Sequence, residues 1–136
     1  MGNIMFREVG SDNSVKVWSV SERKEVASLA GHTNSVCSVA FSPDGQHIVS
    51  GSSDKLVKVW SLSERKQVAS LAGHMDWVRS VAFSPDGQHI VSGSHDKLVK
   101  VWSVSARKEV ASLAGHMSGV YSVINITMNI NCCIRD

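Results

Sequence analysis

The chain alternates short apolar runs with polar segments rich in Ser, Gly, Asp and Lys, and the clearest example spans residues 31–72. The first run there is almost wholly apolar or small, as expected of a strand covered on both faces. In the third run Val57 and Val59 share one face. We therefore expect four β-strands, at Val36–Phe41, His47–Ser52, Leu56–Trp60 and Gln67–Leu71.

Turn residues separate the predicted strands. Ser42-Pro43-Asp44-Gly45 lies between the first two strands. There Pro fixes φ, Asp can accept bonds from backbone N–H groups, and Gly lets the chain reverse. Asp54 lies in the next turn, and the polar stretch 61–66 makes the third connection. No segment has a helical period long enough to compete, so the four strands should form an antiparallel meander and not a βαβ unit.

Segment 31–72 is followed by a near copy at 73–114, in which only eight positions differ. Tryptophans and histidines recur at the same spacing of 42 residues, at Trp18, Trp60, Trp102, His32, His74 and His116. A chain of 136 residues would normally form one compact domain. A repeat of this kind instead predicts a row of similar sheets, because one unit cannot close its own core.

The repeat divides the chain into segments. Because residues 4–18 align with residues 46–60, residues 1–30 form a partial unit with the second to fourth strands. Two full units follow at 31–72 and 73–114. Residues 115–124 supply the first strand of a further unit, from Val120 to about Ile124, and the tail 125–136 departs from the repeat.

The repeated motifs resemble those of the WD40 β-propeller family. They are the Gly-His pair of each unit, the Ser-Pro-Asp-Gly turn, the Ser-Gly-Ser-x-Asp stretch and Val-Lys-Val-Trp, and they cover about residues 4–124. The Asp that usually follows the strand tryptophan is replaced by Ser19, Ser61 and Ser103. The resemblance implies an all-β fold of four-stranded antiparallel blades. About three blades' worth is present, an incomplete ring, since propellers have typically about 4 to 8 blades.

Ser, His and Asp recur together in both full units, which suggests a Ser-His-Asp hydrolase with Ser50 or Ser92 as nucleophile. In WD40 proteins the matching positions form a structural hydrogen-bond chain from Trp through Ser and His to Asp. Repetition of the set, and the lack of a GxSxG motif, favour this structural role. The resemblance therefore implies two structural tetrads, His32, Ser50, Asp54 and Trp60 and then His74, Ser92, Asp96 and Trp102.

Five of the eight differences between the full units lie in the Gly-His loop, at the start of the first strand and just before the turn Asp. In a propeller these places share one face, through which WD40 proteins commonly contact protein partners. Trp and Arg are typical binding anchors. We expect a protein or peptide to bind at Ser35, Cys37, Ser53, Met75, Asp76, Trp77, Arg79, His95 and Tyr121. Neutral drift is the alternative, and it is the preferred explanation for Leu62/Val104, Glu64/Ala106 and Gln67/Glu109.

Composition excludes several other classes. With 43% hydrophobic residues, 19% charged residues and a net charge of +2, the chain has no charge excess that would favour binding to nucleic acid or to a membrane. It lacks a secretory signal and an apolar run of roughly 20 residues, so a cytoplasmic location is expected. Cys37, Cys132 and Cys133 fit neither a disulfide framework nor a zinc site. We expect reduced thiols, no metal and no cofactor, and the repeated lysines and arginines, Lys58 and Lys100 among them, should form a solvated surface.

These observations predict a non-enzymatic protein-interaction scaffold, a fragment of a larger propeller, that binds through its Gly-His loop face. Near-identical units of this kind resemble sensor arrays appended to large signalling NTPases. A structural remnant without a partner is a further alternative. Asp12 and Trp18 of the leading partial unit would form a composite tetrad with His116 of the trailing segment. This tetrad would be impaired because Glu8 occupies the position of the Ser. Open strand edges at both ends favour self-association.

Overall fold

A computed structural model of the chain describes residues 3–4, 13–114, 120–126 and 130–134, and for the strands at 3–4, 120–126 and 130–134 it describes only their pairing. The described part is all-β, and none of its residues lies in a helix that could cross a membrane. The strands are β1 Asn3–Ile4, β2 Val15–Ser19, β3 Lys24–Leu29, β4 Val36–Phe41, β5 His47–Ser52, β6 Leu56–Ser61, β7 Lys66–Ala72, β8 Val78–Phe83, β9 His89–Ser94, β10 Val99–Ser103, β11 Lys108–Leu113, β12 Val120–Ile126 and β13 Ile130–Ile134.

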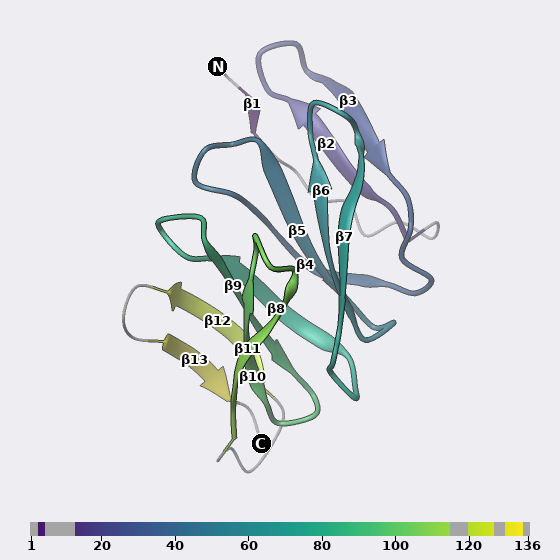
Figure 1. The fold of residues 1–136 in the computed structure, drawn as a ribbon. Coiled ribbons are helices and arrows are strands. Elements are labelled where there is room, and N and C mark those ends of the chain that lie inside the picture. The colour runs from purple at the N-terminus through teal and green to yellow at the C-terminus, as the bar shows by residue number, and fades with distance from the viewer. Residues whose placement is uncertain (1–2, 5–12, 115–119, 127–129, 135–136) are drawn as a thin grey trace.

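Each full unit folds as one four-stranded antiparallel sheet, in the orders β4-β5-β6-β7 and β8-β9-β10-β11. The three-stranded sheet β1-β2-β3 precedes them and the two-stranded sheet β12-β13 follows (Figure 1). The described strands do not close into a ring. The expected fold class, an all-β row of four-stranded antiparallel sheets that forms an incomplete ring, is confirmed.

The two ends differ from the simple repeat. In the first full unit Ile48 lies opposite Trp60, so the repeat would place residue 6 opposite Trp18. The structure instead pairs Ile4 with Trp18, a shift of two residues. At the other end, the tail that was expected only to depart from the repeat contributes β13, which pairs antiparallel with β12.

The Ser-Pro-Asp-Gly turn is held by its own side chains. The Ser42 hydroxyl donates to the Asp44 carboxylate over 2.6 Å and accepts from the His47 backbone N–H over 3.0 Å. The same carboxylate accepts from the Gln46 N–H at 2.9 Å. Gly45 has φ of +73°, a left-handed conformation that glycine adopts without strain. The turn therefore sets the β4–β5 register from local chemistry alone.

Neighbouring sheets pack face to face, and this seam contains the hydrophobic core. Valines and a leucine of β6 and β7, with Val49 of β5, pack on Val78, Val81, Ile90 and Trp102 of the second full unit. The seam between the leading unit and the first full unit repeats this arrangement. Gly51 permits the close approach, because a Cβ there would lie 2.6 Å from a methyl group of Val78. The apolar face of each full unit is thus buried by the neighbouring unit and not by other strands of the same unit.

Two expectations about burial were wrong. The first strand of the first full unit is only partly covered beyond Val36. It lies at the edge of its own sheet, and although β8 packs on one side, the described part of the leading sheet has no first strand on the other. Lys58 and Lys100 are buried and not part of a solvated surface. The Lys58 Nζ donates to Gln67 Oε1 at 2.8 Å and to Ser70 Oγ at 3.2 Å.

The difference Gln67/Glu109 therefore changes the partner of a buried lysine. In the second full unit the Lys100 ammonium contacts the Glu109 carboxylate at 2.8 Å, a charged contact that the neutral Gln67 amide cannot match. Charge-assisted hydrogen bonds are stronger than hydrogen bonds to neutral groups.

We predict that Gln67→Glu stabilises the protein by about 0.5 kcal/mol, because it converts this contact into an ion pair that remains partly exposed to solvent. Glu109→Gln should destabilise by a similar amount. Urea unfolding monitored by circular dichroism measures both changes. The control is Gln67→Glu in a Lys58→Met background, where the gain should vanish; an equal gain there would show that the charge acts elsewhere.

Candidate functional site

The structure brings together the four residues expected of each tetrad. In the first full unit the indole N–H of Trp60 donates to Ser50 Oγ over 2.8 Å, and Ser50 Oγ lies 2.6 Å from His32 Nε2. His32 Nδ1 lies 2.8 Å from Asp54 Oδ2. The second full unit repeats these contacts within 0.1 Å, at 2.8, 2.7 and 2.7 Å, through Trp102, Ser92, His74 and Asp96.

The hydrogen bonds of the tetrad all run in one direction, from the tryptophan toward the aspartate. Because the indole can only donate, Ser50 Oγ accepts from Trp60 and has its own proton free for His32 Nε2. His32 then carries its proton on Nδ1 and donates it to the Asp54 carboxylate. Every polar atom of the chain is satisfied when the imidazole is neutral, which assigns the tautomer.

The titration behaviour of the tetrad agrees with this assignment. Burial is the largest influence on His32 and lowers its pKa below the usual 6.5, although the hydrogen bond to Asp54 opposes the shift. For Asp54 burial alone would raise the pKa. Hydrogen bonds from His32 and from the N–H groups of Thr33 and Leu56 outweigh it and hold the pKa of the carboxyl below its usual value. His74 and Asp96 shift in the same directions.

Burial separates this arrangement from a hydrolytic triad. The Ser-His-Asp connectivity is the one that a serine hydrolase uses, but Ser50 and Ser92 are 0% exposed. A substrate carbonyl must approach the nucleophilic oxygen closely, and here the indole and the imidazole occupy that oxygen's surroundings. The geometry favours cross-linking of the sheet over nucleophilic attack.

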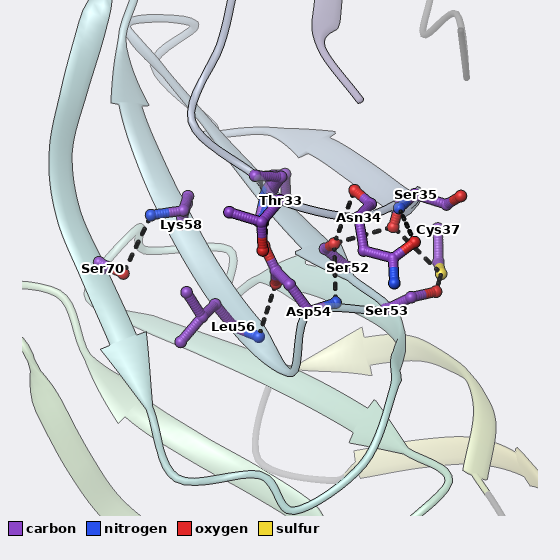
Figure 2. Close-up of polar contacts among 12 residues, drawn as sticks. Thr33, Asn34, Ser35, Cys37, Ser52, Ser53, Asp54, Leu56, Lys58 and Ser70 are labelled. Atoms are coloured by element: carbon purple, nitrogen blue, oxygen red, sulfur yellow. Dashed lines mark hydrogen bonds and ion pairs between the residues drawn. The ribbon is translucent and has the colours of Figure 1, made fainter. Parts of the chain in front are cut away.

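The tetrad also holds the Gly-His loop in place. Asp54 Oδ2 accepts from the Thr33 backbone N–H at 3.0 Å while Asp54 Oδ1 accepts from the Leu56 N–H at 3.0 Å (Figure 2). Ser52 reaches the same loop, since its hydroxyl donates to the Ser35 carbonyl at 2.8 Å. No role was predicted for Ser52 from the sequence. Ser52 follows Ser50 by two residues in the Ser-Gly-Ser motif, so both lie on the same face of the strand. This spacing could have identified Ser52 as a second residue that reaches the loop.

The unit-specific positions of the first full unit lie together beside this loop. Cys37 Sγ lies 3.5 Å from Ser53 Oγ and 3.8 Å from the Ser35 carbonyl oxygen (Figure 2). The Ser53 N–H donates to the same carbonyl at 2.9 Å. Ser53 is buried, so Ser35 and Cys37 offer more surface to a partner than Ser53 does.

At the equivalent positions the second full unit carries rings in place of hydroxyl groups. The rings of Trp77 and His95 lie with their centroids 5.3 Å apart at an interplanar angle of 34°. The backbone N–H of His95 donates to the Trp77 carbonyl at 3.0 Å. Trp77 is 43% exposed, and Met75 on the same loop is more exposed still. Asp76 accepts from the Trp77 N–H at 2.8 Å, which caps the loop. The structure thus groups Met75, Asp76, Trp77 and His95.

The remaining candidate positions have different outcomes. Arg79 lies on β8 at the place that Cys37 takes on β4, and it is half-buried. Tyr121 lies on β12, whose side chains are outside the described residues, as are Glu8, Asp12 and His116 of the expected composite tetrad. Within the described part, the Trp18 indole N–H is buried without a hydrogen-bond partner. The same part contains no group of three or more His, Cys, Asp or Glu side chains that could hold a metal.

Removal of the central hydroxyl tests the tetrad. Ser50→Ala leaves the indole N–H of Trp60 and Nε2 of His32 buried without a partner, so the free energy of unfolding should fall by about 1–3 kcal/mol. Ser92→Ala should lose a similar amount, whereas Ser63→Ala, at an exposed loop serine, should change it by less than about 0.5 kcal/mol. Chemical denaturation measures all three. Equal losses at Ser50 and Ser63 would contradict the structural role.

Acid should weaken the fold through the same residues. The folded-state pKa values of His32 and His74 lie below 6.5, so as the pH falls below 6.5 the unfolded chain takes up protons that the folded chain does not. The unfolding temperature should therefore decrease from pH 7 to pH 5. Differential scanning calorimetry of His32→Gln with His74→Gln provides the check. This variant should be less stable at pH 7 but have a shallower pH dependence; an unchanged slope would assign the effect to other groups.

Comparisons with known proteins agree with this geometry. Two stretches, 23–61 and 65–103, match the family model "WD domain, G-beta repeat". An uncharacterized WD repeat-containing protein of Synechocystis is 50% identical over 42 residues, 31% of this chain and 12% of that protein. Meiotic fizzy-related protein 1 of Schizosaccharomyces pombe is 45% identical over 40 residues, 29% of this chain and 10% of that protein. The chain thus spans a small part of these relatives.

Solved structures show the same arrangement of strands. The structure of U3-55K and the crystal structure of the RRP9 WD40 repeats each superpose with a TM-score of 0.85 at 29% identity. Both alignments cover 93% of this chain, and they cover 40% and 39% of the respective structures. The resemblance inferred from the repeated motifs is confirmed. Because the two matched stretches together make up more than half of its residues, the chain belongs to the WD40 (WD domain, G-beta repeat) family.

Proposed function

We propose that the chain is a non-enzymatic scaffold that binds a protein or peptide through its Gly-His loop face. WD40 repeats are typical protein-interaction modules, and the burial of Ser50 and Ser92 leaves no accessible nucleophile in either full tetrad. The observation that carries the proposal is the exposed Trp77, in ring contact with His95, at positions where the otherwise near-identical first full unit has two serines.

Rigidity of the loop supports this function. Two backbone N–H groups of the second full unit, those of Met75 and Leu98, donate to the Asp96 carboxylate at 3.0 and 2.9 Å, and His74 anchors the same carboxylate. A loop that is already ordered loses little conformational entropy when a partner binds, which favours affinity. The tetrad therefore serves the face indirectly, as the support that positions Met75 and Trp77.

The composition of the face indicates the partner's chemistry. An exposed indole on the same loop as Met75 provides an apolar contact area. The His95 ring lies against the indole, and Arg79 follows Trp77 by two residues, on β8. Trp and Arg are the side chains most often found as energetic anchors of protein interfaces. An exposed tryptophan is otherwise a liability for solubility. A peptide with an apolar side chain that packs on the indole and a hydrogen-bond acceptor for the Arg79 guanidinium fits this surface.

Loss of both anchors should abolish binding without loss of the fold. Peptides selected from a random library on the wild-type chain should bind Trp77→Ala with Arg79→Ala at least about 100-fold more weakly, since hot-spot residues contribute about 2 kcal/mol or more each and about 1.4 kcal/mol is tenfold. Fluorescence anisotropy measures the affinity and circular dichroism the melting temperature, which should change little.

The first full unit provides the matched control for this experiment. Ser35→Ala with Cys37→Ala alters the equivalent positions and removes no aromatic or cationic anchor, so binding should be retained. Equal affinities for both double variants would refute the proposed face. A large fall in melting temperature for the Trp77 and Arg79 variant would instead assign these residues to structure.

A further inference from the structure

The turns of each full unit lie at two opposite ends of its strands. The second turn of the first full unit is on the Gly-His loop face, since the Ser53 N–H donates to the Ser35 carbonyl at 2.9 Å. The first and third turns meet at the other end, where the Leu62 N–H donates to the Gln46 carbonyl at 3.0 Å. The second full unit repeats this bond at 3.0 Å. We call this second surface the turn face, formed by residues 42–46, 62–65, 84–88 and 104–107.

A groove of about 300 Å³ opens on the turn face, in the internal seam between the two full units. Its apolar wall consists of Pro43 from the first full unit and of Phe83 and Val104 from the second. The turns that border it pack directly on each other, because a Cβ on Gly87 would lie 3.7 Å from the Pro43 ring. The groove is therefore a product of the packing between two complete four-stranded sheets.

Two carboxylates line this groove, one from each unit, and each is held by its own turn. Asp44 Oδ1 accepts from the Ser42 hydroxyl at 2.6 Å and from the Gln46 N–H at 2.9 Å. Asp86 makes the equivalent two contacts with its own turn, at 2.5 and 2.9 Å. The serine hydroxyls are the largest influence on both carboxyl groups and lower their pKa values, so both groups are charged at neutral pH.

The second oxygen of each carboxylate, Oδ2, has no partner in the described part of the chain. No hydrogen bond there reaches Oδ2 of Asp44 or Asp86, and the ion pairs of lysines in that part are made with glutamates. The only other titratable residue that lines the groove is His47. The groove thus presents two fixed anionic acceptors beside an apolar wall, without a lysine or arginine counter-ion from the described residues.

This combination fits an arginine side chain better than other groups. The guanidinium is planar, has five N–H donors and stacks on aromatic rings, while its methylene stem packs on apolar surface. Phe83 and Val104 offer that apolar surface, and the two carboxylates offer the acceptors. Gln88 and Ser105, which also line the groove, carry further oxygen acceptors. A lysine ammonium has only three donors and would leave more of these acceptors without a partner.

We propose that this groove binds an arginine side chain of a partner peptide, on the face opposite the Gly-His loops. The stem packs on Phe83 and Val104, and the guanidinium donates to the carboxylates of Asp44 and Asp86. Both units are needed, because each supplies one of the two carboxylates. The site is independent of Trp77, so it stands or falls separately from the function proposed for the Gly-His loop face.

A peptide with a single arginine tests the proposal on the full-length chain. The probe is acetyl-Gly-Gly-Arg-Gly-Gly-amide, titrated into isotope-labelled protein and followed by NMR. It should shift the backbone amide signals of Gly87, Gln88 and Ser105 and saturate in the millimolar range, because few atoms make contact. The matched control replaces the arginine with citrulline, whose urea group has a similar shape but no charge. It should bind at least about threefold more weakly, since it loses the contacts between opposite charges.

Substitution of the carboxylates assigns the binding to these two residues. Asp44→Asn and Asp86→Asn retain an oxygen that accepts from the serine hydroxyl and the backbone N–H, so both turns should stay formed. Each variant should bind the arginine peptide about two- to fivefold more weakly. Asp76→Asn is the control, because it removes an acid of the Gly-His loop face and should leave the affinity unchanged. Circular dichroism checks the fold of all three variants.

Occlusion of the groove provides a test that leaves both carboxylates in place. Ser105 is exposed and lines the groove, so the indole of Ser105→Trp should occupy it and weaken binding at least about threefold. Ser63→Trp changes the equivalent residue of the first full unit, which does not line the groove, and should bind as the wild type does. If an asparagine variant unfolds, this pair decides.

Three results would overturn the proposal. The first is equal affinity for the arginine and citrulline peptides. The second is that the shifted signals belong to the Gly-His loops and not to the turn face. The third is that Ser105→Trp and Ser63→Trp bind the arginine peptide equally well.

Discussion

The seam between neighbouring sheets is the interaction on which the rest of this protein depends. A four-stranded unit of 42 residues has two apolar faces and cannot cover either of them alone. Val57, Val59 and Leu71 are buried only because Val78 and Trp102 of the next unit lie against them. Gly51 marks how close this approach is, since no Cβ fits between the two sheets there. Stability is therefore shared between neighbours, as in other repeat proteins, and every unpaired face is a potential interface.

The seam is also connected to the chemistry of the loop face through one side chain. Trp60 packs in the hydrophobic cluster with its ring and donates its N–H to Ser50, at the head of the tetrad. His32 and Asp54 carry that connection to the backbone of the Gly-His loop. A Ser-His-Asp set with the distances of a hydrolase thus acts as a cross-link, because packing of the indole against it removes the access that catalysis requires. The equivalent tetrad of the second full unit, headed by Trp102, orders the loop on which Trp77 is displayed.

Local patterns predicted most of the strands and turns, because turn chemistry and strand alternation act over a few residues. The limits of the two full units' strands agree with the expected ranges to within one residue, and Ser42, Asp44 and Gly45 form the expected turn. Predictions failed where burial depends on residues far away in the chain. Lys58 was expected in solvent and lies buried against Gln67, and β4 was expected to be covered on both faces but is only partly covered. The strand β13 had no precedent in the repeat.

By itself the sequence determined the unit: its length, its four strands and its turns, which repeat and depend on short-range chemistry. The residues of its tetrads followed from the family resemblance of its motifs. Only the tertiary structure decided which faces are covered. Leu71 and Leu113 occupy identical positions in near-identical units, yet one is 3% and the other 42% exposed. The difference arises from the neighbour and not from the residue, because hydrophobic burial is a property of two surfaces in contact.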